Sequence, residues 1–286
     1  MPNSKISRRA TEVQGSIQWA TPKGVLGELV LAAEARAAEL RPRSKEIEDK
    51  ALSAPPATNF LSALERKTVA VIAEVKRSSP SKGGINPGLD VAEQVAAYER
   101  GGAAAISILT EPSRFGGDIA DLAAARAATG LPLLRKDFIV DVIQIAEARA
   151  AGASAVLLIA RALDPSKLEE LFRASVEYKL HALIEVRNES ELERALSVGG
   201  AIIGVNNRNL ETLEMDGAAL ELIPHIPRKC IAIAESGYRT PSDIETVARA
   251  GADAVLIGSE LSASPNPAQL LAGFASINRS GNARPN

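Results

Sequence analysis

The amino-acid sequence predicts an α/β protein, a single-domain (β/α)8 TIM barrel with an N-terminal helical extension. Eight short apolar runs follow one another from residue 69 onward, and a helix-length amphipathic segment follows each run. The length of 286 residues lies in the range in which such barrels form one domain. Runs this continuously apolar are typical of parallel strands buried on both faces, so eight of them predict a closed barrel. An open doubly wound sheet is less favoured, because no Gly-rich dinucleotide turn follows the first run.

The predicted strands are the eight apolar runs. In chain order they are VAVIAEVK at 69–76, AAISILTE at 104–111, LPLLRKD at 131–137, ASAVLLIA at 153–160, HALIEV at 181–186, AIIGVNN at 201–207, CIAIAES at 230–236 and ADAVLIGS at 252–259. Helical spacing of apolar residues predicts helices between them, for example at 90–100, 164–178 and 241–250. The last two have proline in the first turn, after Asp164 and Thr240, where proline suits a helix start. Gly-Ala turns recur before alternate strands about every 50 residues, which supports a repeat of two strand-helix units.

Composition divides the chain into four predicted segments. Residues 1–21 are polar and partly basic, which predicts a disordered lead whose targeting role stays open. Residues 22–65 predict a helical extension packed on the barrel, and residues 66–275 the barrel itself. Residues 276–286 are polar and predict a frayed tail.

Composition and charge exclude several classes of protein. A formal net charge of -2 and an apolar content of 46% are typical of a globular protein that binds neither nucleic acid nor membranes. No apolar run approaches the roughly 20 residues that a membrane span needs. The single cysteine, Cys230, rules out a disulfide framework, and the sequence therefore predicts a cytoplasmic protein.

Charged and polar side chains gather where the predicted strands end, and the active site of such a barrel lies at those ends. They are Glu74, Lys76, Lys136, Glu185, Asn206, Arg208, Glu235 and Ser236. Because side chains alternate along a strand, Ile72, Glu74 and Lys76 share one face, so both charges point into the barrel mouth if Ile72 lies inside. A spacing of two residues likewise places Lys136, Glu185 and Glu235 on the same strand face as an apolar residue that is expected to lie in the interior.

Two lysines and three glutamates in so apolar a setting are costly unless they pair. A ring of structural salt bridges is one interpretation. Proton transfer is the favoured one, because neighbouring charges and burial shift the pKa values of lysine and glutamate. Neither a metal site nor a catalytic triad is predicted, because His181 and His225 fall away from the carboxyl ends of the strands and Cys230 stands alone.

A phosphate site is predicted at one sector of the barrel. Gly237 follows the seventh strand, and Gly258 and Ser259 follow the eighth, the two loops in which barrels commonly hold phosphate. Ser78 and Ser79 follow the first strand, which adjoins the eighth when the barrel closes. The clustering of three such loops favours a phosphorylated small-molecule substrate.

A series of motifs runs between residues 59 and 261: EVKRSSPSKG, SILTE with FGGD, LLRKDFIVD, LIEV, GVNNRNL, AESG and IGSEL. Taken in this order, they resemble the indole-3-glycerol phosphate synthase family of tryptophan biosynthesis. The first, KDF and NNRNL are together highly specific, whereas AESG and IGS occur across phosphate-binding barrels. The resemblance implies a carbon-carbon lyase that closes the indole ring of a carboxyphenylamino-deoxyribulose phosphate with loss of carbon dioxide and water.

The resemblance also implies roles for the charged residues. Lys136 would be the general acid that protonates the ketone oxygen during ring closure. Lys76 and Glu185 would serve substrate positioning and the later proton transfers, in a division that stays open. Glu74 would orient Lys76.

The remaining implied contacts surround the substrate. Asn206 and Glu235 would hold the ribulose hydroxyls. Arg208 could pair with Glu235 or approach the substrate carboxylate. The implied substrate-binding residues are Arg208, Ser236, Phe115, Phe138 and Leu210, and the implied phosphate-binding residues are Ser79, Gly237, Gly258 and Ser259. The reaction implies no cofactor and no metal, and contact with other tryptophan-pathway enzymes stays open.

Three alternatives remain at this stage. A phosphoribosylanthranilate isomerase would want a Cys and Asp pair, and Cys230 lies too early in its strand. An aldolase would use Lys136 for a Schiff base. A non-catalytic barrel that serves as a scaffold is disfavoured, because every implied proton-transfer residue is present.

Overall fold

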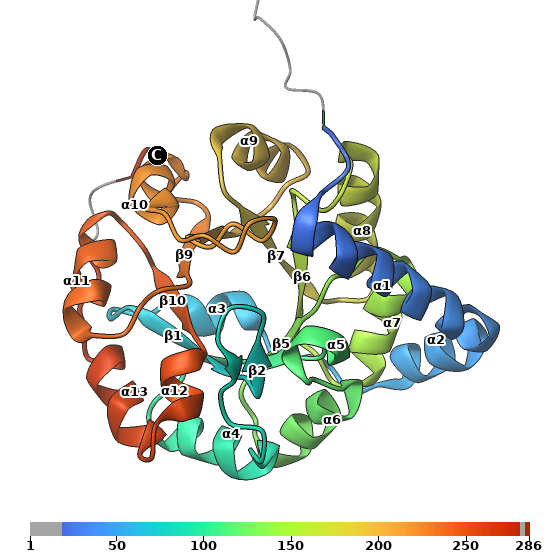
Figure 1. The fold of residues 1–286 in the computed structure, drawn as a ribbon, viewed down its shortest axis with the longest axis horizontal. Helices are drawn as coiled ribbons and strands as arrows, with labels where there is room; N and C mark the ends of the chain where they lie inside the picture. The colour runs from blue at the N-terminus through green and yellow to red at the C-terminus, as the bar shows by residue number, and fades with distance from the viewer. Residues whose placement is uncertain (1–18, 281–283) are drawn as a thin grey trace, which may run out of the picture.

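Eight parallel strands close into a barrel in the computed structural model, which describes residues 19–280 and 284–286 (Figure 1). The order around the barrel is β1-β10-β9-β8-β7-β6-β5-β4. The strands are β1 Ala70–Val75, β4 Ala105–Leu109, β5 Leu133–Lys136, β6 Ala155–Ile159, β7 His181–Val186, β8 Ile202–Asn206, β9 Ile231–Glu235 and β10 Ala254–Ile257. The predicted (β/α)8 fold with an N-terminal helix is confirmed.

The barrel closes where the first strand meets the last. Ala70 of β1 lies beside Ala254 of β10, and Ile72 of β1 lies beside Ala105 of β4 on the other side. Helices cover the outside and side chains fill the inside, so strands such as β1, β4, β6 and β9 are buried along their whole length. Burial on both faces explains why the strands are runs of apolar residues without alternation.

The loop after β1 folds into a short hairpin that the sequence did not predict. Strand β2, Ser78–Ser79, pairs antiparallel with β3, Gly83–Gly84. The Lys82 backbone N–H donates to Oγ of Ser79 at 3.2 Å and tightens the turn between the two strands. This hairpin brings the loop over the middle of the barrel (Figure 1).

Helices form the outer ring. They are α4 Val91–Arg100, α5 Pro112–Phe115, α6 Ile119–Ala128, α7 Val142–Ala150, α8 Pro165–Glu177, α9 Glu189–Ser197, α10 Ala218–Leu222, η2 Ile223–His225, α11 Pro241–Arg249, α12 Ser259–Ala263 and α13 Pro267–Ala275. Asp164 and Thr240 cap α8 and α11 with proline at the next position, as their sequences predict. Among the described residues, no helix is long and apolar enough to cross a membrane.

The N-terminal extension packs against the barrel through α1 Gly24–Leu40, η1 Arg41–Arg43, α2 Ser44–Ser53 and α3 Phe60–Leu64. Helix α2 lies along α7, where Ala37, Ile47 and Ala51 form a small apolar cluster with Ile143 and Ala146. In Figure 1 the blue helices α1 and α2 run beside α7.

The chain enters α1 through a close backbone contact. Gly24 has φ of +58°, and a Cβ atom there would lie 2.3 Å from the carbonyl oxygen of Glu211, so only glycine fits. Trp19 donates its indole N–H to the carbonyl of Arg161 at 3.2 Å, and Arg161 donates to the carbonyl of Ala20 at 2.6 Å. Most of the predicted disordered lead, residues 1–18, lies outside the described residues.

The described part of the C-terminal tail is bound to the barrel, in contrast to the predicted fraying. Asn278 forms a β-bridge with Thr68, and Arg279 pairs with the buried carboxylate of Asp253. Arg284 is also buried and contacts Asp253 at 2.6 Å and the carbonyl of Cys230 at 3.1 Å. The polar composition of the tail did not predict these contacts, because the carboxylate that the arginines bind is distant in sequence.

Replacing Arg284 should destabilise the protein. Arg284→Met leaves Asp253, whose side chain is 2% exposed, with fewer partners. Loss of one member of a buried ion pair typically costs about 3 kcal/mol. Urea unfolding measures the change, and Arg173→Met, which removes an exposed pair with Glu169, should cost less than about 1 kcal/mol. Equal midpoints for both variants would contradict the buried role of Arg284.

Candidate active site

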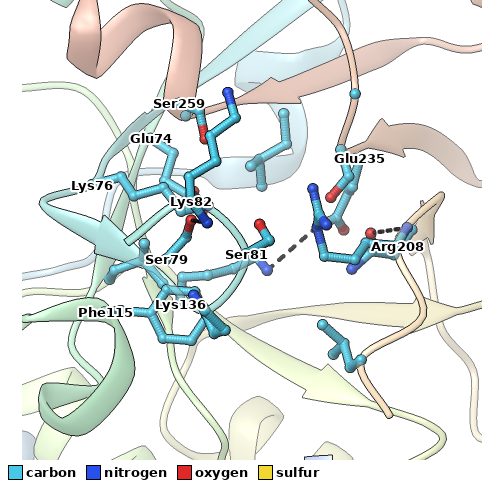
Figure 2. Close-up of a pocket in the computed structure, with 18 of the residues that line it drawn as sticks. Glu74, Lys76, Ser79, Ser81, Lys82, Phe115, Lys136, Arg208, Glu235 and Ser259 are labelled. Carbon is cyan, nitrogen blue, oxygen red and sulfur yellow. Dashed lines mark hydrogen bonds and ion pairs between the residues drawn. The ribbon is translucent and has the colours of Figure 1, made fainter. Parts of the chain in front are cut away.

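A cavity with an empty volume of about 1100 Å³, open to solvent at its mouth, lies at the carboxyl ends of the strands (Figure 2). Every predicted site residue except Glu185 lines it. They are Glu74, Lys76, Ser79, Phe115, Lys136, Phe138, Asn206, Arg208, Leu210, Glu235, Ser236, Gly237, Gly258 and Ser259. Glu185 contacts the cavity-lining residues Lys136 and Asn206 and borders a second, smaller pocket.

The first charged centre comes from the end of β1. Nζ of Lys76 lies 3.0 Å from Oε1 of Glu74, and it also lies 5.7 Å from the ring centroid of Phe115. The hydroxyl of Ser107 donates to the other Glu74 oxygen at 3.4 Å. The Lys76 backbone N–H donates to Oγ of Ser262, and this hydrogen bond holds the backbone at the end of β1. Lys76 is thus a positioned cation beside an aromatic wall.

The second charged centre comes from β5, β7 and β9. Nζ of Lys136 lies 3.4 Å from Oε2 of Glu185 and 3.5 Å from Oε2 of Glu235. The Asn206 amide donates to the remaining Glu185 oxygen at 3.0 Å, which fixes the carboxylate under the lysine. Figure 2 shows Lys136 reaching from one wall of the pocket toward Glu235 on the other. The alternation of side chains along the strands therefore predicted the meeting of these charges correctly.

Burial and charge set the protonation of this second centre. Burial lowers the pKa of Lys136, but the carboxylates of Glu235, Glu185 and Glu74 outweigh burial, so the pKa is raised and the ammonium is charged. Burial raises the pKa of Glu235 to about 8, against the attraction of Lys136. Because this pKa lies above neutral pH, Glu235 keeps a proton there.

The predicted phosphate residues come from three loops that line the same cavity. Ser79 comes from the hairpin after β1, Gly237 follows β9, and Gly258 and Ser259 follow β10. Ser236 and Gly237 have φ values of 66° and 93°, so the chain turns sharply just after Glu235. A left-handed serine costs roughly 1 kcal/mol, and such strain is commonly kept at functional sites.

Arg208 lies at the cavity wall and does not make the first of its two predicted contacts, the pair with Glu235. Its guanidinium donates to the carbonyl of Leu213 at 2.9 Å rather than pairing with Glu235. Its backbone N–H donates to Oδ1 of Asn206 at 2.9 Å. Arg208 thus fastens the loop after β8.

A family model described as indole-3-glycerol phosphate synthase matches residues 29–273 of the chain. The chain belongs to the indole-3-glycerol phosphate synthase family. The resemblance of the sequence motifs is thereby confirmed.

Curated members of the family are similar over most of the chain. Indole-3-glycerol phosphate synthase 1 of Streptomyces coelicolor is 47% identical over 246 residues, which cover 85% of this chain and 91% of that protein. Indole-3-glycerol phosphate synthase of Rhodococcus jostii is 50% identical over 223 residues, which cover 78% and 83%. A solved thiamine phosphate pyrophosphorylase from Pyrococcus furiosus is 14% identical with a TM-score of 0.52, covers 73% of this chain and 94% of its own, and shows the fold alone.

The structure adds cavity residues that the family motifs did not single out. Lys82 of the hairpin and Arg239 after β9 both pair with Glu260 of α12, at 3.1 Å and 3.7 Å. Val25 and Leu29 of α1 also line the cavity. Lys82 is the last residue of the motif EVKRSSPSK, but the sequence did not show that the hairpin directs its side chain toward the cavity.

A network behind Lys136 ties α1 to the cavity wall. Arg36 of α1 lies 2.8 Å from Oδ1 of Asp137, the residue after Lys136, and 3.5 Å from Oε1 of Glu111. Glu111 accepts hydrogen bonds from the first N–H groups of α5, including that of Phe115. The N-terminal extension therefore supports both Lys136 and the aromatic wall.

No group of three or more metal-ligating side chains occurs in the described ranges 19–280 and 284–286. His181 begins β7, at the end of the barrel away from the cavity, and His225 lies in η2.

The Glu235 carboxyl should make stability depend on pH. Its pKa in the folded protein, about 8, exceeds the ordinary value of 4.5, so its contribution is complete below the ordinary pKa and is lost as pH rises through about 8. Glu235→Gln lacks this titration. The unfolding free energy of the variant relative to the parent should therefore rise by at least about 1 kcal/mol between about pH 5 and pH 8.

Urea titrations at several pH values measure this difference. Glu245→Gln on the exposed surface of α11 removes the same type of group and should show a flat difference. A flat difference for Glu235→Gln as well would contradict a proton held on Glu235.

Proposed function

We propose that this protein acts as an indole-3-glycerol phosphate synthase, which closes the indole ring of a carboxyphenylamino-deoxyribulose phosphate. The arrangement that carries the proposal is a pair of lysine-glutamate centres in one cavity that serine and glycine residues of the loops after β1, β9 and β10 also line. The curated relatives carry the same name in their own organisms. The reaction consumes one substrate and yields an indole, carbon dioxide and water.

Ring closure needs a proton at the ketone oxygen. Lys136 supplies it while the ring carbon that bears the carboxylate attacks the ketone carbon and forms the new carbon-carbon bond. Carbon dioxide then leaves, and its bonding electron pair restores the aromatic ring. The buried carboxylates keep Lys136 charged, so an acid is present when the substrate arrives.

Dehydration needs a second acid and a base. Lys76 lines the cavity and is the acid that protonates the departing hydroxyl, while a base takes the proton from the adjacent carbon and completes the indole. Glu74 lies 3.0 Å from Lys76 and lines the same cavity, so it is positioned for this exchange. Glu185 contacts Lys136, and this contact supports a role for Glu185 in orienting the Lys136 side chain and returning a proton to it.

The rest of the cavity fits the rest of the substrate. Phe115 and Phe138, with ring centroids 6.4 Å apart, offer apolar walls to the arene. Asn206 and Glu235 bind the ribulose hydroxyls. Arg208 and Ser236 contact the same ribulose part of the substrate. Ser79, Gly237, Gly258 and Ser259 hold the phosphate.

The direct experiment is to mix the purified protein with the carboxyphenylamino substrate and follow indole fluorescence, without added metal or cofactor. Fluorescence should appear with time and in proportion to protein. An absence of turnover would favour the scaffold alternative.

Lys136→Met should fold normally and lose at least about a hundredfold in kcat, the usual scale for a general acid. Initial rates of indole fluorescence measure the loss. Lys167→Met on the exposed side of α8 removes an equivalent cation and should keep the parental kcat. Near-normal turnover of Lys136→Met would refute its role as the acid.

Borohydride reduction in the presence of substrate separates the aldolase alternative. A Schiff base on Lys136 would be trapped as a mass increase on that residue. We expect no adduct, because the proposed reaction passes through no covalent enzyme intermediate.

Glu260→Gln should strengthen phosphate binding. The Glu260 carboxylate pairs with Lys82 and Arg239 at the phosphate end, so it competes with an incoming dianion for both cations. Its removal should lower the Kd for inorganic phosphate by about threefold, the scale of one partly exposed ion pair. Isothermal titration measures the Kd, with Glu245→Gln as the matched control, and weaker binding in Glu260→Gln would contradict the competition.

A further inference from the structure

Two glutamates of the barrel mouth lie directly against glycines of the neighbouring chain segments. A Cβ atom at Gly204 of β8 would lie 2.1 Å from Oε1 of Glu235. A Cβ atom at Gly258, after β10, would lie 2.4 Å from Oε1 of Glu74. Both separations are far below van der Waals contact, so any side chain at either position would displace a carboxylate of the charged cluster.

We propose that Gly204 is a positioning residue for the reaction, because its missing side chain leaves the recess that keeps the Glu235 carboxylate against Lys136. The inference rests on the proposed function. Oε2 of Glu235 reaches Lys136 at 3.5 Å, while Oε1 lies in the recess and accepts no hydrogen bond from the described part of the chain. Gly204 is not among the residues that line the cavity, so it acts through Glu235 rather than on substrate.

The backbone gives no other reason for glycine at this position. Gly204 lies inside β8, in regular register beside Glu185 on one side and Ile233 on the other, and it is not among the glycines with positive φ. Glycine in a strand interior lowers stability and often marks the close approach of another group. The closest atom to its missing Cβ is Oε1 of Glu235, and the next is Cδ1 of Leu183 at 3.1 Å.

Filling the recess would change the second charged centre. The Glu235 carboxylate would have to rise from the barrel interior toward the cavity, into the space proposed for the ribulose hydroxyls. Lys136 would then retain Glu185 as its close partner, 3.4 Å away. The position of the proton donor Lys136 and the surface proposed to bind the ribulose hydroxyls would both change, although neither Lys136 nor Glu235 had been substituted.

Gly258 repeats the arrangement for Glu74 and thereby for Lys76. A substitution at Gly258 would also disturb the cavity wall that is proposed to hold phosphate. Gly204 is the cleaner position for a test, because the nearest obstacles to a new Cβ atom are the ends of two flexible side chains, Glu235 and Leu183, and it does not line the cavity.

Gly204→Ala should fold, because the main obstacle is the end of a flexible side chain, and should lose at least about tenfold in kcat through misplacement of Glu235. In the Gly204→Ala background, Glu235→Asp should raise kcat at least about threefold, because the shorter side chain fits above the new methyl group. In the parent, Glu235→Asp should lower kcat instead. This change of sign distinguishes positioning from a general loss of stability, and additive effects of the two substitutions would overturn the proposal.

Gly130→Ala is the matched control. Gly130 has open space around its missing Cβ and no positive φ, so the variant should keep the parental kcat. If Gly204→Ala does not fold, the double variant with Glu235→Asp should recover folding, since the obstacle has been shortened. A double variant that does not fold would also contradict the proposed role of Gly204.

A second measurement does not depend on turnover. NMR of selectively labelled lysine, with Lys136→Arg for assignment, should show a shifted Lys136 ammonium signal in Gly204→Ala and an unshifted one in Gly130→Ala. An unchanged signal in Gly204→Ala would overturn the recess. If the parent itself makes no indole, the proposed function fails, while the NMR comparison still decides whether Gly204 positions Glu235.

Discussion

The charge balance of the barrel mouth is the constraint on which the rest of the site depends. Five ionisable groups, on strands from opposite sides of the barrel, are removed from bulk water, and carboxylates outnumber ammonium groups. Burial of an uncompensated charge is costly, so the cluster holds an additional proton on Glu235. The neighbouring carboxylates raise the pKa of Lys136 and keep it charged, which is the state that a proton donor needs.

The surrounding structure keeps the two lysines in separate positions. Lys76 lies between Glu74 and the ring of Phe115, while Lys136 lies among carboxylates from β7 and β9. Arg36 joins α1 to Asp137 beside the second lysine and to Glu111 beneath the aromatic wall. The N-terminal extension is therefore part of the framework that sets the geometry of the cavity, in addition to covering the barrel.

The sequence predicted those features that follow from backbone geometry. Alternation along β1 placed Glu74 and Lys76 on one face, and the continuous apolar runs indicated strands buried on both sides. The contact of Arg208 with Leu213, the pairing of Lys82 with Glu260 and the burial of Arg284 were not predictable in this way. Each depends on the path of a loop or on a partner distant in sequence, and periodicity carries no information about either.

The position of Glu185 bears on the division of labour between the proton-transfer residues. Sequence motifs treat Lys76 and Glu185 alike, but Lys76 lines the cavity, whereas Glu185 contacts the cavity-lining residues Lys136 and Asn206. In the proposed reaction, the contact with Lys136 suits Glu185 to orient that lysine and return a proton to it, and Lys76 would act on the departing hydroxyl. Each lysine would then serve one stage of the proposed two-stage reaction.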